Sequence, residues 1–253
     1  MSNNLKVAKN RQLCYTELIS DIKQKNGEYM IKEICVAGIK LGNYTVRESL
    51  MRIDRAFYEN NFTTVEEVYM RSLFLAREDQ VVKQVIESMD VIVIAEMGIL
   101  DVAGEKNLQR KYEIEENEFF YQLLKRIERG NKKIFLLGEI EKEIELAREF
   151  ILDEFPKVTI AGALALSKCV GDEESVINEI NTQTPDVIIS VLPSPKQEHF
   201  LHCHKDKLSA NLWYGIGDGK FAKRRHRITT ALIKLFRVKK LMKYIKRYEK
   251  QEE

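Results

Sequence analysis

The chain has 253 residues, of which 44% are hydrophobic and 32% are charged, and its formal net charge is +2. This apolar content supplies a sizeable core and excludes wholesale disorder, and the length suits one large domain or two small ones. No apolar run approaches the roughly 18 residues of a membrane-spanning helix, and the first residues lack the apolar segment of a signal peptide, so we expect neither.

Short apolar runs and longer amphipathic segments alternate along the chain. In the first half of the chain we expect a strand and turn at 33–42, a helix at 46–60, a strand or helix start followed by a helix at 65–88, and a buried strand at 90–98. Next we expect a helix ended by Gly130 at 117–133, a strand at 133–138, a helix ended by Pro156 at 140–156, and a strand at 157–164. The last expected elements are a helix at 172–185, a strand at 186–192, a short helix at 197–209 and a strand at 210–217. This alternation predicts an α/β fold, a Rossmann-like parallel sheet with helices on both faces.

Charge divides the chain into an acidic body and a basic tail. Residues 220–253 hold 13 Lys and Arg against 3 Asp and Glu, a net of +10, and the remaining residues hold 28 against 36, a net of −8. We therefore expect an N-terminal helical segment at 1–32, a Rossmann-like domain at 33–219, and a basic amphipathic appendage at 220–253 that meets something anionic.

The tail has the pattern of a helix that lies on a membrane surface. Apolar residues recur every three or four positions from Ile228 to Tyr248, which makes one apolar stripe. Such a helix binds an anionic membrane surface through its cations, although the stripe can instead pack on the body of the protein or on a partner. The expected membrane-binding residues are Lys234, Arg237, Lys239, Lys243, Lys246 and Arg247.

The stretch VLPSPKQEHFL places Lys196, Gln197 and Glu198 directly after an apolar strand. In parallel sheets, ligands bind beyond the carboxyl ends of the strands. The same loop opens an expected helix, whose first amide groups favour an anion such as a diphosphate. A strand-to-helix turn with exposed polar residues is the alternative, and geometry alone favours neither.

The longer stretch PDVIISVLPSPKQEHFL resembles the signature of the WecG/TagA/CpsF family of bacterial glycosyltransferases. The segments 36–53, 75–80, 133–138 and 213–219 are similar to further family segments in the same order, so the resemblance covers about residues 33–250. The residues that match the signature itself are Pro185, Asp186, Pro195, Lys196, Gln197 and Glu198.

The resemblance implies a membrane-associated, inverting glycosyltransferase. It would move an N-acetylhexosamine-type sugar, of the N-acetylmannosamine class, from a UDP donor to a sugar on a polyprenyl diphosphate in cell-surface polysaccharide synthesis. It implies no metal and no other cofactor. The protein would be cytoplasmic and peripheral at the inner face of the bacterial cell membrane, and four separate cysteines without a CxxC pair agree with a reduced compartment.

The resemblance also implies site residues. Lys196, Gln197 and Glu198, with the glycine turns at Gly138 and Gly217, would surround the donor. These five residues would provide the polar contacts and the close backbone approach that a diphosphate requires.

The chain departs from the family pattern at the expected base. The family's Pro-Asp-Gly turn, whose Asp is the proposed base, falls on Ile94, Ala95 and Glu96, so that Ala95 stands in place of the Asp. A shift of one residue brings Glu96 to that position, and Glu96 is our expected general base. The family's Thr-x-Asn falls near Glu67–Tyr69, and its Arg-x-x-Gly-x-Asp segment falls near Glu113–Glu118; neither is kept.

These departures leave other interpretations open. The chain can be a non-catalytic member of the fold that supports or scaffolds an active glycosyltransferase, and it can form a homo-oligomer. His199, His202 and Cys203 share a helix face that suits Zn²⁺, but no distant cluster supplies a fourth ligand, so we expect no metal site. The basic tail also suits a nucleic acid, which we do not expect as a partner.

Overall fold

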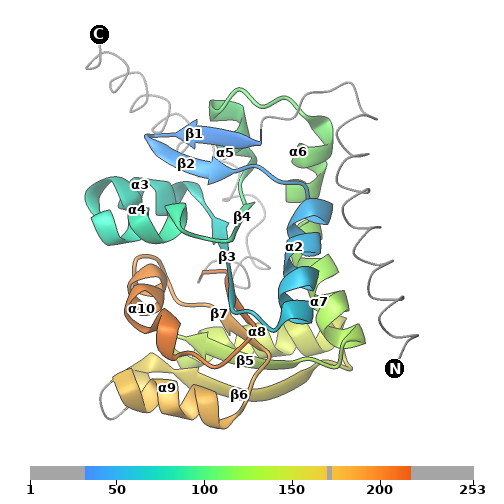
Figure 1. The fold of residues 1–253 in the computed structure, drawn as a ribbon, viewed down its shortest axis with the longest axis vertical. Helices are drawn as coiled ribbons and strands as arrows, with labels where there is room; N and C mark the ends of the chain where they lie inside the picture. The colour runs from blue at the N-terminus through green and yellow to red at the C-terminus, as the bar shows by residue number, and fades with distance from the viewer. Residues whose placement is uncertain (1–31, 170–172, 218–253) are drawn as a thin grey trace, which may run out of the picture. The chain divides into compact units, whose positions relative to one another are not determined.

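The computed structural model describes residues 32–169 and 173–217 (Figure 1). Its centre is a six-stranded sheet in the order β4-β3-β8-β7-β5-β6, and every neighbouring pair of strands is parallel. This confirms the predicted Rossmann-like fold class. The strands are β3 (Thr63–Val68), β4 (Val91–Ile94), β5 (Lys133–Gly138), β6 (Thr159–Ala165), β7 (Val187–Ser190) and β8 (Leu212–Gly215).

Helices cover both faces of this sheet (Figure 1). One face packs against α2 (Val46–Glu59), α7 (Glu118–Arg129) and α8 (Glu141–Glu154). The other face packs against α3 (Met70–Glu78), α4 (Gln80–Glu87), α9 (Glu173–Thr182) and α10 (Lys196–His204). The short helices α5 (Met97–Val102) and α6 (Leu108–Glu115) follow β4, and two 3-10 turns follow β6 and α10, at Leu166–Lys168 and Lys205–Lys207.

Side chains alternate between the two faces along each strand, as the pleat requires. On β8, Tyr214 packs in the core beneath α2 and α7, whereas Trp213 packs in the core beneath α9 and α10. The same alternation on β3 separates Glu66 from Glu67, which decides the roles of these two carboxylates.

The start of α2 is fixed by local sequence. Thr45 is the N-cap: its hydroxyl oxygen accepts a hydrogen bond from the Glu48 amide, and the Glu48 carboxylate accepts one from the Thr45 amide. This capping box satisfies two amide groups that a helix start otherwise leaves without partners. It also sets the position of the preceding loop, which reaches the candidate site.

The segment 33–42, for which we predicted one strand and a turn, contains two strands. This segment is a β-hairpin, β1 (Glu33–Val36) and β2 (Ile39–Gly42), which forms its own antiparallel sheet apart from the parallel one. The turn consists of Ala37 and Gly38, with φ angles of 56° and 75°. Two consecutive positive φ angles produce the tight turn that lets a chain pair with itself directly. The hairpin's inward residues pack with α3, α4 and α5.

The remaining elements follow the expected order with small shifts. The segment 65–88 contains β3, α3 and α4, and the helices are separated at Asp79, whose carboxylate caps α4 by accepting from the amides of Val81 and Val82. The sequence did not predict α5 or α6. The N-terminal segment at 1–31 and the tail at 220–253 lie outside the described residues. No helix in the described ranges has the length and apolarity needed to cross a bilayer.

Candidate functional site

A small pocket lies at the carboxyl ends of β3 and β4, with α2 and α6 around it. Its volume is about 150 Å³. Pockets that enclose a whole drug-sized ligand measure roughly 300–1,000 Å³, so this one is too small to enclose such a ligand entirely. The lining residues are Tyr44, Val46, Ser49, Glu67, Tyr69, Val93, Ile94, Ala95, Arg110, Glu113, Ile114, Asn117 and Phe119.

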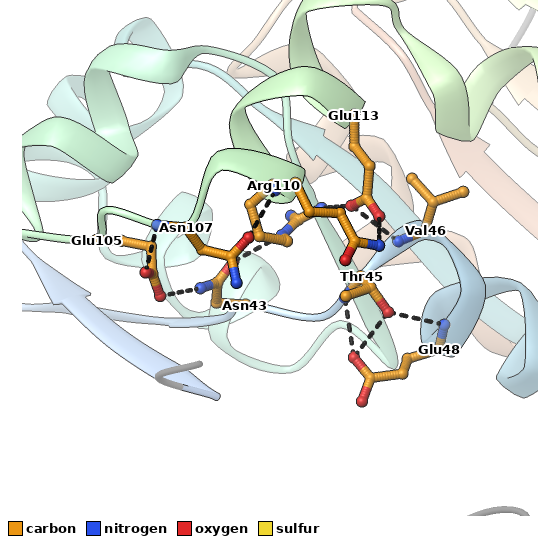
Figure 2. Close-up of polar contacts among 9 residues, drawn as sticks. Asn43, Thr45, Val46, Glu48, Glu105, Asn107, Arg110 and Glu113 are labelled. Carbon is orange, nitrogen blue, oxygen red and sulfur yellow. Dashed lines mark hydrogen bonds and ion pairs between the residues drawn. The ribbon is translucent and has the colours of Figure 1, made fainter. Parts of the chain in front are cut away.

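A buried polar network fixes α6 as one wall of the pocket. Figure 2 shows Arg110 and Glu113 of α6 facing the loop that precedes α2. The Arg110 guanidinium forms an ion pair with Glu113 and donates from Nε to Asn43 Oδ1 at 3.0 Å. Glu113 Oε2 also accepts from the Val46 amide at 3.1 Å, and Asn43 Nδ2 donates to Glu105 at 3.1 Å.

This network ties residues that are 67 positions apart in the chain. Because its charged members are buried, the loss of one partner leaves the other charged, dehydrated and without compensation. The network therefore holds α6 at the start of α2 and keeps the pocket open.

Glu67 brings a carboxylate into the same pocket from β3. Only 3% of its surface is exposed. Tyr214 on β8 donates a hydrogen bond from its hydroxyl to Glu67 Oε1, and Tyr69 donates to Oε2 at 2.7 Å. Burial, and then the negative charge of Glu67, raise the pKa of Tyr214 well above its usual value. Tyr214 therefore stays protonated and acts as a donor to Glu67.

Ala95 and Glu96 point to different sides at the end of β4. Ala95 lines the pocket. Glu96 is buried, and its Oε2 accepts from the amide of Met70, the first residue of α3, at 3.3 Å. A carboxylate at a helix start is stabilised there by the unpaired amides. Glu96 is not among the residues that line the pocket, whereas Glu67, which the sequence analysis did not propose as a site residue, is one of them.

The Lys196–Glu198 stretch lies at the start of α10, on the opposite face of the sheet from the pocket. Gln197 and Glu198 are buried, with 2% and 0% of their surface exposed, so the alternative of a turn with exposed polar residues does not describe these two. Glu198 accepts from the Ser194 hydroxyl at 2.6 Å. Gln197 packs on Gly215, where an added Cβ would lie 2.6 Å from Gln197 Nε2.

Gln197 and Glu198 also enclose Glu66 of β3. Glu66 is 0% exposed, and burial, followed by the charge of Glu198, raises its pKa well above the usual value for a glutamate. Lys196 differs from its neighbours because its side chain is 58% exposed and forms an ion pair with Glu139 at 2.6 Å. Of the three residues, Lys196 alone is exposed.

The two predicted glycines have different surroundings. A Cβ at Gly138 would lie 2.7 Å from Ile144 and 2.9 Å from Val191, so a packing requirement explains that glycine. Gly217 has a φ of 77°, and among the described residues beyond its chain neighbours no heavy atom comes within 4 Å of where a Cβ would stand. A backbone requirement therefore explains Gly217.

The histidine cluster does not converge on one point. His199 contacts Asp79 at 2.6 Å, whereas His204 contacts Glu173 at 2.6 Å. Among residues 32–169 and 173–217, no group of three or more His, Cys, Asp or Glu side chains is placed to hold a metal ion. The expected membrane-binding residues Lys234, Arg237, Lys239, Lys243, Lys246 and Arg247 lie outside the described ranges.

The chain is similar to known proteins over most of these elements. Two relatives, from Bacillus spizizenii and Staphylococcus aureus, are both named N-acetylglucosaminyldiphosphoundecaprenol N-acetyl-beta-D-mannosaminyltransferase. The Bacillus protein is 26% identical over 144 residues, which are 57% of this chain and 55% of the relative. The Staphylococcus protein is 22% identical over 191 residues, which are 73% of each chain. This chain thus spans little more than half of the Bacillus relative.

A family model described as the glycosyl transferase WecG/TagA/CpsF family matches residues 34–220. The match runs from the β-hairpin past the end of β8 and so includes the whole parallel sheet, the pocket and the start of α10. The chain therefore belongs to the WecG/TagA/CpsF family of glycosyltransferases.

Proposed function

We propose that this protein transfers an N-acetylhexosamine-type sugar, of the N-acetylmannosamine class, from a UDP donor to a sugar carried on a polyprenyl diphosphate. Family membership supports the reaction class, and the names of the two relatives support this acceptor and this sugar. The observation that carries the proposal is the pocket at the carboxyl ends of β3 and β4, which contains a buried carboxylate. Ligands of doubly wound α/β proteins bind at this edge of the sheet.

The chemistry of the pocket suits a hydroxyl-rich, uncharged ring. Its polar lining includes phenol, hydroxyl, amide and carboxylate groups, and the guanidinium of Arg110 is already paired with Glu113. Such groups form hydrogen bonds with sugar hydroxyls, whereas the two carboxylates repel an anionic ring. A neutral N-acetylhexosamine therefore fits better than a uronic acid.

The donor diphosphate requires cations and amides outside this pocket. Lys196 at the start of α10 is an exposed ammonium group that suits this role. Gln197, Glu198, Gly138 and Gly217 are proposed to shape the donor side, the first two by fixing the start of α10. The reaction in this proposal uses no metal and no other cofactor.

The site of action in this proposal is the cytoplasmic face of the bacterial cell membrane, with the basic tail on anionic lipids. A polyprenyl-linked acceptor resides in the bilayer, so a peripheral enzyme must bind beside it. A homo-oligomer, or a complex with a partner glycosyltransferase, remains a prediction.

A second candidate function rests on Ala95. Because this residue stands where the family resemblance has an aspartate, the chain can also be a non-catalytic member that supports an active glycosyltransferase. The two candidate functions differ in one measurable property: the enzyme transfers the sugar and releases UDP, whereas the non-catalytic member does not.

The test uses the full-length protein with UDP-N-acetylmannosamine and a polyprenyl-diphosphate-linked N-acetylglucosamine. We expect release of UDP together with a lipid product whose mass is one N-acetylhexosamine larger. Donor binding by calorimetry without any UDP release would favour the non-catalytic candidate. Absence of both binding and release, with UDP-N-acetylglucosamine as well, would contradict the proposed function.

A further inference from the structure

Two carboxylates line the pocket, and their surroundings differ. Glu113 belongs to the network of α6, where it is ion-paired with Arg110 and also accepts hydrogen bonds from the Val46 amide and the Gln109 side chain. These three contacts occupy the Glu113 carboxylate and hold it within the network of α6. Glu113 therefore has a structural role in the wall of the pocket.

Glu67 is held instead by phenols. Tyr214 donates to one carboxylate oxygen and Tyr69 to the other, at 2.7 Å. Phenol donors orient a carboxylate without supplying a positive charge. Each carboxylate oxygen also has more than one lone pair, so an oxygen that accepts from a phenol can still receive a proton from a substrate hydroxyl.

The position of Glu67 relative to β4 is set by the sheet. Glu67 pairs in register with Val93, which also lines the pocket, and the Ala95 amide donates to the Val68 carbonyl at 3.0 Å. The side chains of Glu67 and Ala95 therefore reach one cavity from adjacent strands. Ala95 has no group that can exchange a proton, and Glu96 is directed to the Met70 amide.

We propose that Glu67 is the general base of the transfer reaction and that Tyr214 and Tyr69 are its positioning residues. This inference rests on the proposed function. The acceptor hydroxyl oxygen bonds to the anomeric carbon of the donor sugar, and the bond from that carbon to the phosphate oxygen breaks. The hydroxyl proton passes to the Glu67 carboxylate and then to solvent, and UDP leaves with the bonding electron pair.

Glu67→Gln is the direct test, because it keeps the volume of the side chain and one acceptor oxygen for the tyrosines. We expect turnover to fall by roughly 10²- to 10⁴-fold, the usual contribution of a general base, while affinity for UDP-N-acetylmannosamine changes little. Glu66→Gln is the matched control. It also removes a buried carboxylate from β3, but on the opposite face, and it should retain turnover within a few-fold.

Loss of turnover in Glu67→Gln could also come from poor folding, and a second substitution that restores turnover excludes this explanation. Ala95→Asp places a carboxylate on the same cavity from β4, so the double variant E67Q/A95D should recover part of the lost turnover. Tyr214→Phe removes a hydrogen-bond donor that orients Glu67. It should therefore lower kcat while KM for the donor stays within a few-fold, whereas a purely structural role would change donor binding and turnover together.

Tyr69 and Tyr214 donate to Glu67, and Arg110 and Glu113 line the same pocket, so Tyr214→Phe leaves the Tyr69 donor in place. Full turnover in Glu67→Gln would overturn the assignment. Loss of turnover in Glu96→Gln alone would return the role of base to Glu96. If the unchanged protein binds donor but transfers nothing, then the proposed function itself fails, and this inference fails with it.

Discussion

The carboxyl group of Glu66 on β3 lies buried beside that of Glu198 on α10. Two carboxylates in one dehydrated site cannot both remain charged without a large cost, so the pair retains a proton that free glutamates would lose. This relationship joins a strand to the helix that carries the family signature.

Glu66→Gln should stabilise the protein increasingly as the pH rises. The folded-state pKa of Glu66 lies above the ordinary value of 4.5, so its stabilising contribution is complete below pH 4.5 and is lost as the pH rises through the folded-state pKa. Glutamine stays uncharged throughout. Urea unfolding at several pH values should show the variant gaining free energy of unfolding relative to the unchanged protein as the pH rises above 4.5. A difference that does not change with pH would contradict the raised pKa.

Substitutions of Gln197 and Lys196 should affect different properties, the first the free energy of unfolding and the second the affinity for the donor. Gln197 is buried against Gly215, so Gln197→Ala should lower the free energy of unfolding by about 1–3 kcal/mol. Lys196 is mostly exposed, so Lys196→Ala should change the free energy of unfolding by less than about 0.5 kcal/mol while it weakens UDP-sugar binding. Melting curves and calorimetry distinguish the two effects. Unchanged donor affinity in Lys196→Ala would remove this residue from the donor site.

Arg110→Met should destabilise the protein by roughly 3–5 kcal/mol, because it leaves Glu113 charged and buried without its partner. The double variant R110M/E113Q removes both charges and should recover part of this loss. Denaturant unfolding of the single and double variants measures the coupling between the two residues. Equal destabilisation by the single and double variants would show that the ion pair is not what holds α6.

Removal of residues 220–253 should abolish binding to anionic vesicles and leave a folded α/β domain. Each Lys or Arg near an anionic surface contributes about 1 kcal/mol, and salt weakens this contribution. Sedimentation with phosphatidylglycerol vesicles at low and high salt measures the effect. Equal sedimentation of the full-length and shortened chains would rule out the tail as the membrane anchor.

The sequence by itself determined the fold class and most of the strands and helices of the parallel-sheet fold, but not the β-hairpin, α5 or α6. Continuous apolar runs such as 133–138 and 186–192 are typical of strands buried on both faces, and the Pro-Lys-Gln-Glu motif at 195–198 indicated the family. A signal for Glu67 was also present, since two adjacent glutamates, Glu66 and Glu67, stand between two valines in a strand whose six residues are all buried.

Only the tertiary structure decided what these residues do. Side chains alternate along a strand, so adjacent glutamates face opposite sides of the sheet. Glu66 meets Glu198, whereas Glu67 meets Tyr214 across a separation of 147 residues. A local pattern cannot encode such a contact, because it depends on which strands are neighbours. For the same reason, the sequence placed Glu96 beside Ala95 without revealing that Ala95 lines the pocket, whereas the Glu96 carboxylate accepts from the first amide of α3.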